Sequence, residues 1–163
     1  MKTLLLLRHA KSNWKDSEQD DHDRPLNKRG KRDAPRMGQL LRGEGLLPEL
    51  IVSSSARRAR KTAEHVIHHS GYRGETRFTV ELYHASRPQL LALVGALPDS
   101  ASRILLIGHN PGLEELLEAL TSECRALTTA ALAQVEANVD SWQRLSEGGL
   151  AKLVKVWQPR ELD

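Results

Sequence analysis

The sequence predicts a three-layer α/β/α sandwich in which the central sheet is mostly parallel and has an antiparallel edge. Apolar runs too short for helices alternate along the chain with longer segments of helical period. Several of these runs are continuously apolar, as in strands that helices cover on both faces. The last two apolar segments instead alternate loosely and are joined through Gly148-Gly149, which suits an antiparallel pair of strands.

The composition bounds the class of protein. With 163 residues, 39% hydrophobic and 28% charged, we expect a soluble protein with one domain over residues 1–163. The net charge of only +3 and the 4% aromatic content argue against a nucleic-acid partner. The single Cys124 excludes an internal disulfide, and we expect it to be buried or half-buried. Because no signal-peptide or membrane-span pattern is present, we expect a cytoplasmic protein without a membrane partner; the oligomeric state is left open.

The N-terminal region predicts a buried strand followed by a loop. Met1 to Leu7 forms the strand, because Leu4–Leu7 is apolar, lacks a helical period and is too short for a helix. Residues 11–28 are polar without a period and predict a long surface loop, which in a compact domain is often functional. His22 lies there among three aspartates. These acids are consecutive rather than on one face, so we interpret them as solvated loop charge and expect no metal site.

Alternating helices and strands follow the loop. Asn27 is the expected N-cap of a helix over residues 28–43, which carries one apolar stripe. A second buried strand, Leu50–Val52, leads into a helix that continues to about His69. Further along we expect a strand at Phe78–Leu82, a helix at Arg87–Leu97, a strand at Ile104–Ile107, a helix at Leu113–Leu120, and strands at Ala131–Glu136 and Leu150–Trp157.

Three strand ends carry residues suited to phosphate chemistry. They are Arg8-His9, the Ser54–Arg58 region and Gly108-His109, and each lies at a junction between a strand and a helix, so all three can meet at one edge of the sheet. Two guanidinium groups can hold a phosphoryl group from two sides. One neutral histidine can attack phosphorus, and the other, protonated, can donate hydrogen bonds to the phosphoryl oxygens. Because the cationic side chains supply the charge, we expect no cofactor and no metal.

The same residues resemble the motifs of a known family. Leu7-Arg8-His9-Ala10-Lys11-Ser12 resembles the Arg-His-Gly signature of the histidine phosphatase superfamily, which includes the phosphoglycerate mutases. The stretch from Ser54 to Ala63 resembles its second-arginine motif, and Gly108-His109-Asn110 its second-histidine motif. Ala10, Ser12 and the pattern Arg24-Pro25-Leu26 followed by Gly30 are most similar to the bacterial phosphohistidine phosphatase branch. The resemblance covers residues 2 to 157.

The resemblance implies a phosphoglycerate mutase-like fold and a role for each motif residue. His9 is the nucleophile, Arg8 and Arg58 bind phosphate, and His109 stabilises it. Lys11 and Ser12 lie close enough to touch phosphate. Two departures are Ala10, in place of the usual glycine, and Ser55, in place of the usual proline.

The general acid is less well marked. Mutase-like relatives carry a glutamate after the third strand, and the corresponding position here is His84, whereas Glu81 lies just before Leu82. Either side chain could protonate a leaving oxygen. A leaving imidazole nitrogen needs a strong acid less, so this departure favours phosphohistidine over alkyl phosphate esters.

The expected activity is that of a phosphatase acting through a phosphohistidine intermediate on His9. Its partner is a phosphorylated protein or a small phosphorylated substrate. Between Arg58 and His109 there is room for one strand and one helix, but not for the lid that relatives acting on small molecules commonly insert. An open site of this kind favours phosphohistidine on a protein surface. A promiscuous small-molecule phosphomonoesterase and a non-catalytic phosphate-binding module remain as alternatives.

Overall fold

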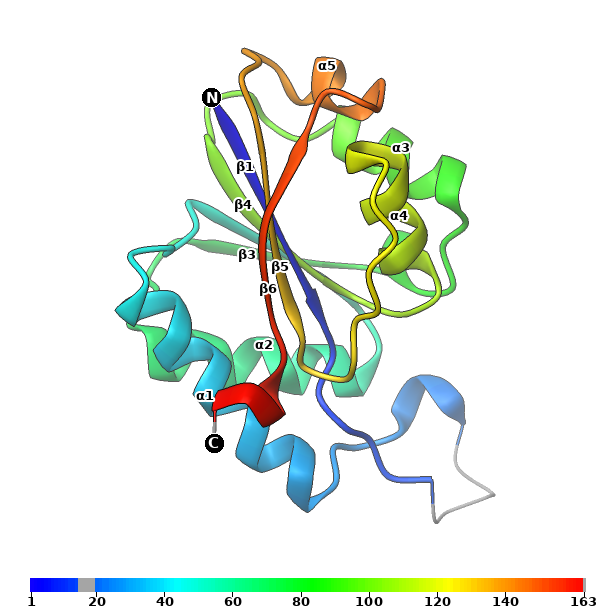
Figure 1. The fold of residues 1–163 in the computed structure, drawn as a ribbon. Coiled ribbons are helices and arrows are strands. Elements are labelled where there is room, and N and C mark those ends of the chain that lie inside the picture. The colour runs from blue at the N-terminus through cyan, green and yellow to red at the C-terminus, as the bar shows by residue number, and fades with distance from the viewer. Residues whose placement is uncertain (15–19, 163) are drawn as a thin grey trace.

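A computed structural model describes residues 1–14 and 20–162, and its centre is a sheet (Figure 1). Within this part of the chain the sheet has six strands in the order β3-β2-β4-β1-β5-β6. The first four of these run parallel, whereas β5 is antiparallel to β1 and to β6. The predicted mostly parallel sheet with an antiparallel edge is therefore confirmed. The strands are β1 (Lys2–Arg8), β2 (Leu50–Ser54), β3 (Glu75–Thr79), β4 (Arg103–Gly108), β5 (Leu132–Ala137) and β6 (Lys152–Trp157).

Helices cover both faces of this sheet (Figure 1). Leu5 and Leu7 of β1 pack into one apolar core with the helices α1 and α2, while Leu4 and Leu6 pack into a second core with α3, α4 and α5. Successive side chains of a strand point to opposite faces, which explains why Leu4–Leu7 is continuously apolar. The helices are α1 (Lys28–Gly43), α2 (Arg57–Ser70), α3 (Arg87–Gly95), α4 (Gly112–Thr121) and α5 (Trp142–Ser146).

The first helix begins where the sequence predicts. The Asn27 side chain accepts a hydrogen bond of 2.9 Å from the backbone N–H of Gly30, as an N-cap residue does. Before α1, the loop contains a short 3-10 helix, η1 (Asp21–Asp23), and a β-bridge between Ser12 and Leu26. The bridge thus joins the two ends of the predicted loop, on either side of residues 15–19, which lie outside the described residues.

Two expectations are corrected. The third strand is Glu75–Thr79 and not Phe78–Leu82, because Val80–Leu82 forms a 3-10 turn, η2, in which the Thr79 hydroxyl accepts from the Glu81 N–H. As an edge strand with exposed side chains, β3 is placed by backbone pairing with β2, so its apolar residues did not mark its bounds. Cys124 is exposed rather than buried, since it lies in the exposed loop that follows α4. None of the helices described combines the length and the apolarity that crossing a membrane requires.

Candidate active site

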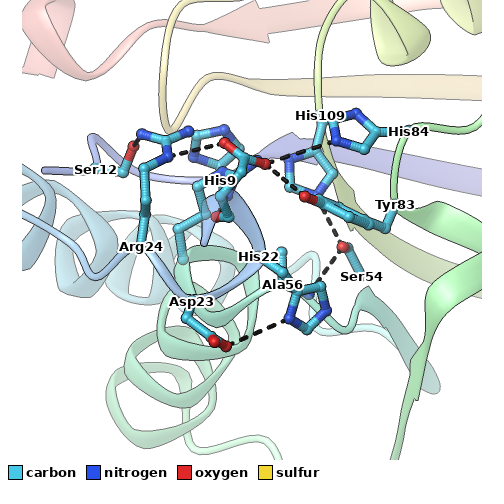
Figure 2. Close-up of polar contacts among 12 residues, drawn as sticks. His9, Ser12, His22, Asp23, Arg24, Ser54, Ala56, Tyr83, His84 and His109 are labelled. Atoms are coloured by element: carbon cyan, nitrogen blue, oxygen red, sulfur yellow. Dashed lines mark hydrogen bonds and ion pairs between the residues drawn. The ribbon is translucent and has the colours of Figure 1, made fainter. Parts of the chain in front are cut away.

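The predicted residues meet at one edge of the sheet. Arg8 ends β1, His9 follows it, Arg58 lies in the first turn of α2 after β2, and His109 follows β4. Because β2, β4 and β1 are parallel neighbours, their carboxyl ends lie side by side. All four residues line one cavity of about 240 Å³. The rings of His9 and His109 lie with their centroids 5.0 Å apart (Figure 2).

His9 is held as a neutral ring with one nitrogen free. Its side chain is buried, and Nδ1 lies 2.7 Å from the carbonyl oxygen of Ala10. A carbonyl only accepts hydrogen bonds, so Nδ1 carries the proton. Burial, together with the charges of Arg58 and Arg8, lowers the pKa of His9 to about 3, although the Ala10 hydrogen bond opposes this shift. At neutral pH, Nε2 therefore carries a free electron pair, as a nucleophile requires.

His109 is also neutral in this arrangement, which corrects the expectation that it is protonated. Burial, and then the proximity of His9 and Arg58, lowers the pKa of His109 to about 3. Its Nε2 lies 2.8 Å from the hydroxyl of Ser54, which itself accepts from the Ala56 N–H (Figure 2). When the proton of His109 is on Nδ1, Nε2 accepts a hydrogen bond from the hydroxyl of Ser54. His109 can thus donate to a phosphoryl oxygen without carrying a charge.

Buried donors without partners belong to residues that line the same cavity as His9. Arg8 uses one Nη atom to donate to the Leu127 carbonyl oxygen, at 3.0 Å. Arg58 donates its Nη atoms to the backbone oxygen and the carboxylate of Asp21, at 2.7 and 3.1 Å. The Nε atoms of both arginines and Nδ1 of His109 are buried and have no hydrogen-bond partner in the described protein. Buried N–H groups without partners are rare, and the oxygens of a bound anion would satisfy them.

Asp21 connects the two sides of the site, a role that sequence reasoning missed. Its carboxylate accepts from the hydroxyl of Tyr83 at 2.6 Å, from Arg24 at 2.9 Å and from Arg58. Burial alone would raise the pKa of Asp21, but the hydrogen bonds from Tyr83 and Arg24 and the charge of Arg58 outweigh it and lower the pKa. The interpretation of Asp21 as solvated loop charge is therefore wrong. The three-residue spacing from Asp21 to Arg24 in a long polar loop is the signal that could have revealed this pair.

Other residues of the loop complete the cavity. Ser12 lines it, and the Ser12 hydroxyl accepts from Arg24 at 2.6 Å, so its own proton remains available to a phosphoryl oxygen (Figure 2). Lys11 lies at the cavity wall, and the Arg24 guanidinium stacks 3.3 Å over the Trp14 ring. His22 lies 2.9 Å from the hydroxyl of Ser55. Among the residues described, no group of histidine, cysteine, aspartate and glutamate side chains is arranged to hold a metal ion.

The two candidate general acids are placed differently. His84 lines the cavity, and its Nε2 lies 3.6 Å from the Asp21 carboxylate. Its backbone has a φ of 54°, in the left-handed region that residues other than glycine rarely adopt. Glu81 is not brought to the site, because η2 directs it to an exposed hollow beside Gln89 and Leu93 of α3. The structure therefore keeps His84, and not Glu81, as a candidate.

Comparisons with known proteins agree with this geometry. The family model of the histidine phosphatase superfamily (branch 1) matches residues 4–82. The chain is 36% identical over 150 residues to an uncharacterized chloroplastic protein of Arabidopsis thaliana, covering 86% of this chain and 68% of that one. A solved structure described as "Putative Phosphohistidine Phosphatase SixA" from Nakamurella multipartitia is 31% identical, with a TM-score of 0.85 over 97% of this chain and 96% of that one.

The chain belongs to the histidine phosphatase superfamily. A second structure, the "putative phosphohistidine phosphatase SixA" from Agrobacterium tumefaciens, is 27% identical and has a TM-score of 0.83 over 97% of this chain and 98% of that one. The sheet and its helices match the phosphoglycerate mutase-like fold of histidine phosphatases. Family membership and these neighbours support a phosphatase that acts on a phosphorylated substrate.

Proposed function

We propose that the protein is a metal-independent phosphatase that forms a phosphohistidine intermediate on His9 and acts on phosphohistidine in proteins. One observation supports the proposed transfer of the phosphoryl group to His9. The unprotonated Nε2 of His9 belongs to a cavity in which Arg8, Arg58 and His109 each have a buried donor without a partner. A phosphoryl group satisfies these donors while its phosphorus faces the nucleophile.

The first step transfers the phosphoryl group to the enzyme. Nε2 of His9 forms a bond to phosphorus as the bond from phosphorus to the leaving group breaks, and the leaving group takes the electron pair. The ring of His9 then carries a positive charge, which the Ala10 carbonyl stabilises through the proton on Nδ1. Arg8, Arg58 and His109 stabilise the charge on the phosphoryl oxygens throughout this step.

The second step returns the enzyme to its starting state. Water attacks phosphorus, the bond from phosphorus to Nε2 breaks with its electron pair returning to His9, and inorganic phosphate leaves. A proton must also be removed from the attacking water. His84 lines the cavity from the side of η2, and its ring can take up a proton, so we assign this proton transfer to it.

Three features support phosphohistidine as the substrate. The two structures at 31% and 27% identity carry that activity in their descriptions. Only β3, η2 and α3 separate α2 from β4 in the described chain, so no large insertion covers the cavity. Among the described residues that line the cavity, the one carboxylate is Asp21, whose lowered pKa keeps it ionised and unable to protonate an alkoxide. A phosphorylated imidazole makes the smallest demand for such an acid.

The test is hydrolysis of a phosphohistidine peptide beside a panel of small phosphate esters, with wild-type protein and His9→Ala. We expect the peptide to be hydrolysed with a higher kcat/KM than any ester, and His9→Ala to abolish both activities. Faster hydrolysis of an ester would point to a small-molecule phosphomonoesterase. Phosphopeptide binding without release of phosphate would point to a binding module.

A further inference from the structure

A second cavity, of about 260 Å³, lies beside the catalytic one and shares His84, His109 and Asn110 with it. Leu82, Leu90 and Leu113 give it apolar walls, and Ser86 and Glu115 also line it. Pockets for drug-sized ligands occupy about 300–1,000 Å³, so a cavity of this size suits a single side chain rather than a large metabolite. The two cavities adjoin at the three shared residues, so a group bound to a phosphoryl in the first lies next to the second.

Asn110 is one of three polar residues at this boundary, with His84 and His109. Its Nδ2 donates to the Leu127 carbonyl oxygen at 2.8 Å, which fixes the orientation of the amide. The other end, Oδ1, is buried and accepts no hydrogen bond in the described protein. A buried acceptor without a partner costs free energy, and a ligand N–H would relieve that cost.

We propose that the second cavity binds the leaving group of the substrate, and that Asn110 Oδ1 accepts a hydrogen bond from a protonated ring nitrogen of that group. This inference rests on the proposed function and deepens it, since it assigns the residue that recognises the phosphorylated imidazole. Phosphate esters of serine, threonine, tyrosine or phenols offer no donor at this position. Asn110 therefore selects for substrates phosphorylated on nitrogen.

This hydrogen bond would help the imidazole to leave. In a phosphorylated imidazole one ring nitrogen is bonded to phosphorus, and the other carries a proton only when the ring is cationic. The bond from phosphorus to nitrogen then breaks with its electron pair passing to the ring, which departs as neutral imidazole with its proton still on the far nitrogen. By accepting from that proton, Asn110 favours the cationic form, so no acid is needed at the nitrogen that leaves.

The experiment compares Asn110→Ala with wild type on two substrates, a phosphohistidine peptide and p-nitrophenyl phosphate. We expect kcat/KM to fall by about 10- to 100-fold on the peptide and to change by less than about threefold on the ester. Asn138→Ala is the matched control, because Asn138 is exposed and follows β5 at the opposite end of the sheet. It should leave both activities unchanged.

A pH profile separates recognition from a structural role. Without Asn110 the bound ring loses its proton more easily, so the decline of kcat on the peptide with rising pH should begin at lower pH than in wild type. Asn110→Ser, which keeps a polar side chain but is too short to reach the same position, should behave as Asn110→Ala does. Circular dichroism and the Tm report whether either variant is folded, independently of both activities.

The outcomes separate this inference from the proposed function. Equal losses on both substrates with an unchanged pH profile would overturn the role of Asn110 alone, because Asn110 would then act only by holding Leu127 and, through it, Arg8. Wild-type hydrolysis of the ester through His9 without hydrolysis of the peptide would overturn the substrate class and the subsite together. No His9-dependent hydrolysis of either substrate would overturn the proposed function itself.

Discussion

Burial decides the charge of the two histidines in the active site. His9 is 7% exposed, and burial lowers its pKa to about 3, while the unfolded chain has an ordinary histidine pKa of about 6.5. Below that ordinary value the unfolded chain binds a proton that the folded protein does not, so the free energy of unfolding falls as the pH falls from about 6.5 towards 3. The site thus obtains a free nucleophile at the expense of stability in acid.

This effect can be measured with His9→Gln, which cannot titrate in this range. Between pH 7 and pH 5, we expect the free energy of unfolding of wild type to fall by about 2 kcal/mol more than that of the variant. Urea denaturation at the two pH values gives both differences. Equal losses in the two proteins would show that His9 keeps an ordinary pKa in the folded state.

Arg58 should be needed for catalysis in a way that its neighbours on α2 are not. Arg58 is buried beside Asp21, whereas Arg60 of the same helix is exposed. Removing a donor aimed at developing charge costs about 10²- to 10³-fold in rate, so we expect Arg58→Ala to lower kcat/KM by about that factor. Arg60→Ala is the control and should stay within about twofold of wild type. Steady-state kinetics on p-nitrophenyl phosphate measures kcat/KM for both variants, and equal values would show that Arg58 is not specifically required.

The sequence predicts which residues gather at the candidate site but not which contacts hold them there. Arg8, His9, Arg58 and His109 could be found because each follows a buried strand, and the ends of parallel strands converge. Asp21 could not be placed in this way, since it reaches the site from a loop whose path depends on packing against α2. His84 and Glu81 could not be separated either, because the turn Val80–Leu82 decides which of them faces the cavity.

Helix α1 holds the loop that follows His9. A Cβ atom added at Gly30, in the first turn of α1, would lie 2.2 Å from the backbone oxygen of Lys11. The helix and the loop at the cavity wall therefore approach as closely as a glycine allows. This packing gives a physical reason for a glycine at position 30, four residues after Leu26 in the sequence.

Gly30→Ala should therefore push the loop and lower both stability and activity. We expect the free energy of unfolding to fall by roughly 1–3 kcal/mol, as for other overpacked sites. Gly43→Ala is the matched control, because nothing lies within 4 Å of a Cβ there, and a helical alanine should leave stability unchanged or raise it by up to about 1 kcal/mol. A Gly30→Ala protein as stable as wild type would show that the loop does not rest on this helix.

The elements of the fold were predictable to the extent that burial marks them. Strands β1, β2 and β4 are buried, and their apolar runs reveal them; α1 is marked by its cap and its apolar stripe. The edge strand β3 is exposed, so composition gave no signal for its bounds. The order of the strands in the sheet required the structure, although the antiparallel pair β5 and β6 was expected from its alternating pattern.

For the molecule as a whole, the site should act as an anion receptor that stabilises the fold. A ligand that binds only the folded protein raises the free energy of unfolding by about 2.7 kcal/mol at a concentration of 100 Kd. We expect inorganic phosphate to raise the Tm of wild type and of Arg60→Ala in a concentration-dependent manner. Arg58→Ala should show little increase. An equal increase in all three proteins would place the phosphate at some other site.

In the proposed mechanism, His9 carries the phosphoryl group during turnover. Rapid quenching of the enzyme with a phosphorylated substrate, followed by peptide mass spectrometry under alkaline conditions that preserve phosphorus–nitrogen bonds, tests it directly. We predict a phosphoryl group on the peptide that contains His9 in wild type and none in His9→Ala, which should also lose at least about a thousandfold in kcat. Turnover at the wild-type rate in His9→Ala, or a trapped phosphoryl group on another residue, would show that His9 is not the nucleophile.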